Sequence, residues 1–413
     1  MKIKLWISIV LVLLCFSFTP YPIDGYEVSG IKRLKYVQLV QQGTIKGTMP
    51  ITGAQKSIKD IKLQLVGRNI SGIPTADAEL QKSLNSLFPS LHESYSIAVL
   101  DISLGKPVRY ASRKETGQYQ PGSVGKLAVA FGLFEELKKI YPDSYKKRQD
   151  LLRTKIVRAG KWALTDGHTV PFFDLETQKL SKRAVAEPDE FSLFEWLDHM
   201  ISVSNNGAAS IVWREAILMR AFGKSYPMLT EEKATEYFKN TPKSQLSELA
   251  IDVVNTPMRN MGITEDEWRL GTLFTKGAGS YIPPKGGSTG SPLGVMKFLI
   301  ALESGKIVDK ESSLEIKRLM YQTDRRIRYA TAPALASAAV YFKSGSLYKC
   351  QPEEGYTCAK YKGNVRNFMN SVAIVEHTDG ATYMVVLMSN VLYKNSANDH
   401  QALASSIDRI IRK

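Results

Sequence analysis

Ser123 and Lys126 open an apolar stretch in the segment QYQPGSVGKLAVAFGLFEEL, residues 118–137. A spacing of three places two side chains on the same face of a helix. Leu127 and Phe131 follow at helical spacing, so we expect this helix to be anchored in a core. A lysine beside a serine is either a packing arrangement at a helix start or a nucleophile with its base.

Two other segments place polar groups where regular structure is expected to stop. SNN, 204–206, interrupts a helical pattern, and KSGS, 343–346, ends an apolar strand pattern. Taken singly, the first also suits a helix-capping turn, and the second a strand end with a solvated lysine. The S-x-x-K spacing recurs at residues 29, 103, 144 and 346, so spacing alone says little.

The order S-x-x-K, S-x-N, K-S-G resembles that of serine β-lactamases and penicillin-binding DD-peptidases, most closely the class A β-lactamases. The resemblance runs from about residue 96 to the C-terminus. It implies an α+β fold, in which strands from both chain ends form one antiparallel sheet beside a mostly helical subdomain. It also implies a serine hydrolase that works through an acyl-enzyme.

The resemblance assigns catalytic roles to four side chains. Ser123 would attack a lactam or peptide carbonyl and become acylated. Lys126 would take the serine proton, provided that burial or a neighbouring cation such as Lys343 lowers its pKa. Ser204 would relay the proton to the leaving nitrogen.

The same resemblance assigns substrate-binding roles. Asn206 would bond the amide of the substrate side chain, and Lys343 with Ser344 would hold the carboxylate that penicillins and D-Ala-D-Ala share. Gly345 would let an extended substrate lie close to the strand. The backbone N–H of Ser346 would form an oxyanion hole with that of the nucleophile.

The chain departs from the class A pattern in its water-activating glutamate, which that class carries in E-x-x-L-N. Glu267 is a candidate, although Gly271 stands at the asparagine position. In an alternative alignment, 269–270 matches the arginine-leucine that precedes the glutamate, and no carboxylate follows. We favour this second alignment, because it places Met261-Gly262 where the class A enzymes have Leu-Gly. Without a carboxylate at that place, slow deacylation of the acyl-enzyme is expected. The chain also carries Asn205 where the S-D-N motif of the class has its aspartate.

The N-terminus resembles an export signal, with basic residues before an apolar run at 5–18 that is too short to span a membrane. We expect a signal peptide or membrane anchor at 1–22 and a basic extension at 23–75 with a short strand or two. A hydrolase domain at 76–413 would contain helical insertions near 141–190 and 218–259. The location would be periplasmic or extracellular.

Cysteine and histidine usage agrees with export. Cys350 and Cys358 bracket a turn and are expected to form a disulfide in an oxidising compartment, the alternative being two free thiols. The five histidines are scattered without metal-ligand spacing, so no metal and no cofactor is expected.

The formal net charge of +15 leaves several partners open. Export disfavours nucleic acid, so an anionic membrane or cell-wall polymer is a better match, and a merely solvated surface is the alternative.

The main hypothesis is an acyl-enzyme hydrolase for β-lactams. Alternatives are a D-Ala-D-Ala carboxypeptidase or endopeptidase acting on peptidoglycan, a non-hydrolytic β-lactam or wall-peptide binder, and a basic surface protein.

Overall fold

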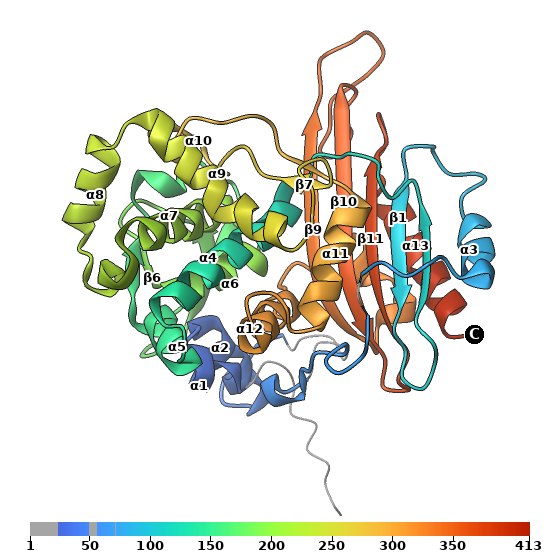
Figure 1. Cartoon of the computed structure of the whole chain (residues 1–413), viewed down its shortest axis with the longest axis horizontal. Helices are drawn as coiled ribbons and strands as arrows, with labels where there is room; N and C mark the ends of the chain where they lie inside the picture. Colours follow the sequence, from blue (N-terminus) through green and yellow to red (C-terminus); the bar gives the residue numbers. More distant parts are fainter. Residues whose placement is uncertain (1–23, 49–55, 71) are drawn as a thin grey trace, which may run out of the picture.

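The computed structural model describes residues 24–48, 56–70 and 72–413 (Figure 1). The predicted leader at 1–22 lies outside the described residues. None of the helices in the described part of the chain is long and apolar enough to cross a membrane.

One antiparallel sheet organises the molecule, in the strand order β2-β1-β11-β10-β9. It comprises β1 (Ser96–Asp101), β2 (Arg109–Arg113), β9 (Ala339–Lys349), β10 (Arg366–Glu376) and β11 (Thr382–Asn390). The N-terminal strand β1 pairs with the C-terminal strand β11, which confirms the predicted sheet from both chain ends.

Both faces of the sheet are covered, and successive residues of a strand enter different cores. Ile97 and Val99 pack with α3 (Ala78–Asn85) and α13 (Ala397–Ile411). Ala98 and Leu100 pack with α11 (Pro292–Glu303) and the helical half of the molecule. Figure 1 shows α11 and α13 on opposite sides of the strands.

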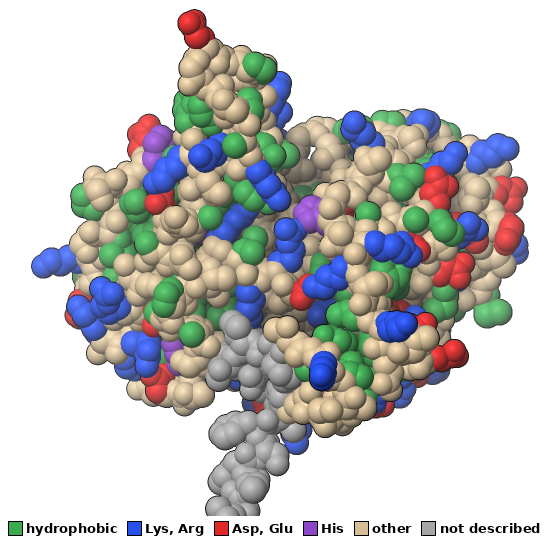
Figure 2. All heavy atoms as spheres, turned by 180° about the vertical axis from the view of Figure 1, so that it is seen from behind, with side chains coloured by type: hydrophobic (Ala, Val, Ile, Leu, Met, Phe, Trp, Pro, Cys, Tyr) green, Lys and Arg blue, Asp and Glu red, His purple; other side chains and the backbone are tan. Residues whose placement is uncertain are grey.

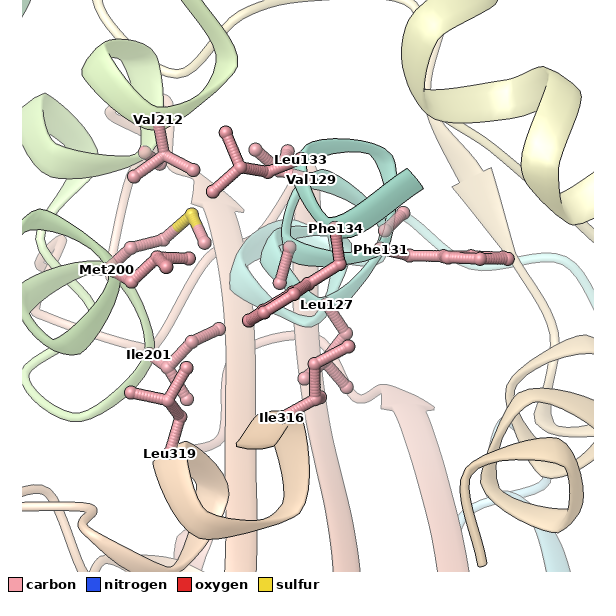
Figure 3. Packing of buried hydrophobic residues seen from close by; sticks show 14 of the residues in the cluster. Leu127, Val129, Phe131, Leu133, Phe134, Met200, Ile201, Val212, Ile316 and Leu319 are labelled. Carbon is pink, nitrogen blue, oxygen red and sulfur yellow. The ribbon is translucent and has the colours of Figure 1, made fainter. Parts of the chain in front are cut away.

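The helical half is built around α4 (Lys126–Ile140), whose apolar side chains are buried along its whole length. Figure 3 shows its side chains converging with those of α6 (Leu193–Ile201), α7 (Asn206–Phe222) and α12 (Lys310–Tyr321). The remaining helices here are α5 (Tyr145–Thr154), α8 (Glu231–Asn240), α9 (Lys243–Asn260) and α10 (Lys276–Tyr281). The predicted mostly helical subdomain is thereby confirmed.

The two insertions differ in structure. The segment 218–259 is largely helical, as expected, and contains α8 and α9. The prediction of a helical 141–190 is wrong beyond α5, because two small sheets follow. These pair β3 (Ile156–Arg158) with β6 (Glu190–Ser192), and β4 (Thr169–Phe173) with β5 (Leu180–Ala184). Pro171 and the β-branched and aromatic residues around it favour a strand over a helix.

The basic extension is helical where it is regular, with α1 (Gly25–Ser29), α2 (Lys32–Gln41) and the 3₁₀ turn η2 (Ile58–Asp60). The strands expected there are absent from its described residues. Ile58, Ile61 and Leu65 are buried at spacings of three and four in the same core as α4. These apolar residues anchor an irregular segment of the chain to that core, and they do not belong to a strand.

The loop between β9 and β10 forms a hairpin that projects beyond the sheet (Figure 1). Cys350 and Cys358 form a disulfide across it, with Cα atoms 5.9 Å apart, as the sequence predicts.

Candidate active site

Ser123 lies in a tight 3₁₀ turn, η3 (Gly122–Gly125), which runs directly into α4. The side chain lines a cavity of about 270 Å³, hereafter the catalytic cavity, which Ser204, Asn206 and Ser344 also line. From β10, the amide of buried Asn370 donates to the carbonyls of residues 120 and 121, at 2.8 and 3.1 Å. The turn that carries Ser123 is therefore held by the sheet.

Strand β9 packs directly against this turn because each element has a glycine at the contact, Gly345 on β9 and Gly122 in η3. A Cβ on Gly345 would lie 2.1 Å from the Pro121 carbonyl oxygen and 3.2 Å from the Ser123 nitrogen. A Cβ on Gly122 would lie 2.8 Å from the Ser346 nitrogen. Gly345 is thus required for packing the strand against the turn, a constraint beyond the substrate contact that the motif implies.

Ser204 lies in the break between α6 and α7, which the sequence places correctly. Its φ of 62° is in the left-handed region, which costs a non-glycine residue on the order of 1 kcal/mol. Asn205 caps α7 by accepting from the Ala208 N–H at 2.6 Å, and it donates to the His168 carbonyl at 2.9 Å. The asparagine that replaces the family's aspartate therefore still supports the turn.

The ammonium group of Lys126 is buried against the SNN turn. Its Nζ donates to the Ser204 carbonyl at 2.6 Å and to Asn206 Oδ1 at 2.7 Å, and lies 5.1 Å from the Phe274 ring centroid. Burial lowers the pKa of Lys126 to about 7, with the Asp166 charge opposing the shift and Arg325 adding to it. A neutral amine has two N–H bonds, which these two acceptors occupy, so its lone pair remains available for a proton.

Lys343 supplies the second amine of the site. Its Nζ donates to Ser204 Oγ at 2.7 Å and to the Ser344 carbonyl at 3.1 Å. Burial, followed by the charges of Lys126 and Arg325, lowers the pKa of Lys343 well below its ordinary value. The Ser204 hydroxyl lies 3.5 Å from Lys126 Nζ, so it stands between the two amines.

Asp166 completes the site and was not anticipated from the sequence. It accepts from the Asn206 backbone N–H at 2.5 Å and from Asn206 Nδ2 at 3.2 Å, and bonds the His168 ring at 2.6 Å. Burial raises the pKa of Asp166, but the hydrogen bonds and charge of His168 outweigh it and hold the pKa below its usual range. The DGH stretch lies in the misassigned insertion and carries no sequence signal.

The arginines of the DRRIR stretch at 324–328 are also part of the site. Arg328 Nη1 donates to the Gly345 carbonyl at 3.0 Å, and both Arg325 and Arg328 line the catalytic cavity. The density of basic residues in this stretch was a signal that could have been used.

Glu267 lies outside the catalytic cavity, which argues against the water-activating role. Its carboxylate pairs with Lys297 at 2.6 Å and accepts from the Thr264 N–H at 2.9 Å. Leu270 and Phe274 line the cavity on this side instead. Among the described residues, no aspartate or glutamate lines the catalytic cavity, in agreement with the alignment in which no carboxylate follows 269–270.

Comparison with known proteins agrees with this architecture. The family model described as "Beta-lactamase enzyme family" matches residues 79–413. A class A β-lactamase from Bacteroides cellulosilyticus is similar at 16% identity and a TM-score of 0.53, covering 82% of this chain and 97% of that one. The TLA-1 extended-spectrum β-lactamase is similar at 14% identity and a TM-score of 0.53, and the match covers 82% of this chain and 100% of that one.

A third solved structure is a variant of PBP-A in an acyl-enzyme complex with penicillin G. It is 12% identical with a TM-score of 0.50, and the match covers 82% of this chain and 97% of that one. A search of curated proteins gave no match. At these identities the solved structures establish the fold alone, whereas the family model covers most of the chain. The chain belongs to the β-lactamase enzyme family.

Proposed function

We propose that this protein is a serine hydrolase that forms an acyl-enzyme on Ser123 with β-lactams or related D-Ala-D-Ala amides. The observation that carries the proposal is that Ser123 and Ser204 line one cavity and that the Ser204 hydroxyl stands between the buried amines of Lys126 and Lys343. The penicillin G acyl-enzyme of the PBP-A variant gives independent support for this substrate class.

Acylation begins with proton transfer from Ser123 to neutral Lys126. The Ser123 oxygen bonds to the carbonyl carbon, and the backbone N–H groups of Ser123 and Ser346 stabilise the developing oxyanion. As the carbon–nitrogen bond breaks, Ser204 delivers a proton to the leaving nitrogen. Lys343 and Ser344 hold the substrate carboxylate, whose negative charge compensates the positive charge that Lys126 gains with the proton.

The cavity lining supports slow release of the acyl group. Hydrolysis of the ester needs a base that activates water, and no carboxylate among the described residues lines the catalytic cavity. The imidazole of His168 does line it, but its Nδ1 is hydrogen-bonded to Asp166 at 2.6 Å. We therefore expect the acyl-enzyme with a β-lactam to persist, as in a penicillin-binding peptidase, with turnover far slower than in an efficient β-lactamase.

A chromogenic cephalosporin assay together with intact mass spectrometry tests the proposal. We expect a stable mass adduct on Ser123 with slow colour development, and no adduct on the Ser123→Ala variant. Rapid turnover without an adduct would show an efficient β-lactamase and contradict the slow release. Absence of both adduct and turnover would point to the non-hydrolytic binding protein.

A further inference from the structure

A second cavity of about 530 Å³ adjoins the catalytic cavity. This cavity, hereafter the side pocket, is defined by Asp166, Lys182, Arg325, Tyr348, Lys360 and Tyr361. Arg325 and Tyr361 line both cavities, so the two are continuous. Figure 2 shows basic side chains gathered near the base of the projecting hairpin.

The order of roles along β9 places the side pocket beside the acyl part of a bound substrate. In the proposed chemistry, Lys343 and Ser344 hold the carboxylate of the departing part, and the backbone N–H of Ser346 lies at the scissile carbonyl. Leu347 and Tyr348 continue the strand beyond that carbonyl and line the side pocket. A strand advances about 3.3 Å per residue, so the pocket begins one or two residues past the oxyanion position, on the acyl side.

The opposite wall of the side pocket leads to the same assignment. Asn206, which would bond the amide of the acyl side chain, donates to Asp166 through its backbone and side-chain N–H groups, at 2.5 and 3.2 Å. Asp166 lines the side pocket together with its neighbours Gly167 and Thr169. A group that the acyl side chain carries beyond its amide would therefore enter the side pocket.

The charged side chains of the side pocket leave a surplus of positive charge. Its two carboxylates already have partners, since Asp166 is hydrogen-bonded as described and Asp324 pairs with Lys182 at 2.8 Å. Within the described residues, no hydrogen bond or ion pair holds the cationic end of Arg325 or Lys360. Two cations thus remain available to an anion.

Aromatic rings of the projecting hairpin position one of these cations. Tyr348 and Tyr361 pack edge to face at 5.7 Å between ring centroids, and the Lys360 ammonium lies 5.3 Å from the Tyr361 centroid. The disulfide closes the same hairpin beyond these residues. The ring contact orients the ammonium without a carboxylate, so its charge is still open to an anionic partner.

We propose that the side pocket binds a carboxylate carried by the acyl side chain of the substrate, so that the enzyme favours acyl groups with an acidic end. The inference rests on the acyl-enzyme chemistry proposed above and names the class of substrate for that site. Lys360 is the specificity-determining residue, because it lines the side pocket and does not line the catalytic cavity. Arg325 adds positive charge where the two cavities join.

Two penicillins that differ in one charge test this inference. The probes are a penicillin with an adipoyl side chain, which ends in a carboxylate, and its side-chain monoamide, in which that end is a carboxamide. We expect the carboxylate to label wild-type Ser123 about fivefold faster at equal low concentration, the effect of a partly exposed charge pair. High salt should lower this ratio, because salt screens the attraction. Lys360→Gln should reduce the ratio toward one.

The matched control is Lys362→Gln, which removes an exposed lysine from the same hairpin outside both cavities and should keep the preference. Equal labelling rates with the two penicillins, faster labelling by the carboxamide, or a preference that Lys360→Gln leaves unchanged would overturn this inference and leave the proposed function standing. Failure of both penicillins to label wild-type Ser123 would remove the proposed function, and this inference with it.

Discussion

Burial suits Lys126 to the proposed role of general base. An exposed lysine is protonated at neutral pH, but desolvation lowers the pKa of Lys126 to about 7, so a large share is neutral at physiological pH. In the neutral form its two N–H bonds are directed to Ser204 and Asn206, which leaves the lone pair free to accept a proton. The proposed acylation uses this neutral form of Lys126 as its proton acceptor.

The acylation rate should therefore depend on the protonation of Lys126. As pH rises through about 7, Lys126 loses its proton and the rate of Ser123 labelling by penicillin should increase to a plateau. The Asp166 charge raises the pKa of Lys126, so Asp166→Asn should move this acid limb to lower pH. Asp174→Asn, an exposed carboxylate outside both cavities, serves as control. An acid limb that stays in place in Asp166→Asn contradicts the assignment.

Glu267 is expected to play no part in deacylation. Because its carboxylate pairs with Lys297 outside the catalytic cavity, Glu267→Gln should leave the release rate of the penicilloyl group within about twofold of wild type. Intact mass measured over time after removal of free penicillin gives this rate. A tenfold or larger slowing would show that Glu267 activates the water.

At the scale of elements, the site is assembled where β9, η3 and the α6–α7 break meet. Period-two alternation places Lys343 on the same face of β9 as Tyr341, which packs in the core of the helical half. Lys126 is the first residue of α4, in the helical half. Each element is fixed by its own core contacts, so the site is organised before any substrate binds.

The close contact of β9 with η3 predicts that one methyl group added at Gly345 slows acylation. In Gly345→Ala the new Cβ would overlap the Pro121 carbonyl, and a backbone atom cannot move aside cheaply. The turn must shift away from the strand, so the acylation rate should fall by about 100-fold or more. The control is Gly279→Ala, where a Cβ meets nothing within 4 Å. Wild-type acylation by Gly345→Ala would show that the contact is not needed.

The parts that sequence predicts best are those specified by local pattern. Apolar spacing identified α4, and the SNN stretch marked the α6–α7 break, because caps and helix periodicity are local. Asp166 could not be found in this way. Its role depends on a loop of the insertion meeting Asn206, a contact between residues that no local pattern links. The strands expected in the extension were wrong because the apolar residues at 61, 63 and 65 alternate in sequence, whereas Ile61 and Leu65 are buried as anchors of irregular chain in the core of the helical half.

At the scale of the whole molecule, the basic extension is an integral part of the structure. Arg33 makes a bidentate contact with Asp198 of α6, at 2.5 and 2.7 Å, and donates to the Gln322 carbonyl after α12. Lys56 pairs with Glu376 of β10, which also binds Lys317. Several of its basic side chains are thus used inside the molecule, which weakens the alternative of a polymer-binding surface.

Removing the Arg33 clamp should destabilise the protein. Asp198 has no exposed side-chain surface, so Arg33→Ala leaves a buried carboxylate without its guanidinium and should lower the free energy of unfolding by about 3 kcal/mol. Urea unfolding measures this. Lys35→Ala, which breaks a partly exposed pair with Glu27, should cost less than about 1 kcal/mol. Equal effects of the two variants would exclude a structural clamp.

The most direct test of the central claim is the rate at which penicillin G acylates Ser123 in wild-type protein and in Lys126→Ala. With Lys126 as the base, the variant should be slower by about 10²- to 10⁴-fold. Lys139→Ala, which removes a half-exposed lysine from the same helix, should acylate at the wild-type rate. Near-normal acylation of Lys126→Ala, or a penicilloyl group on any residue other than Ser123, would contradict the account.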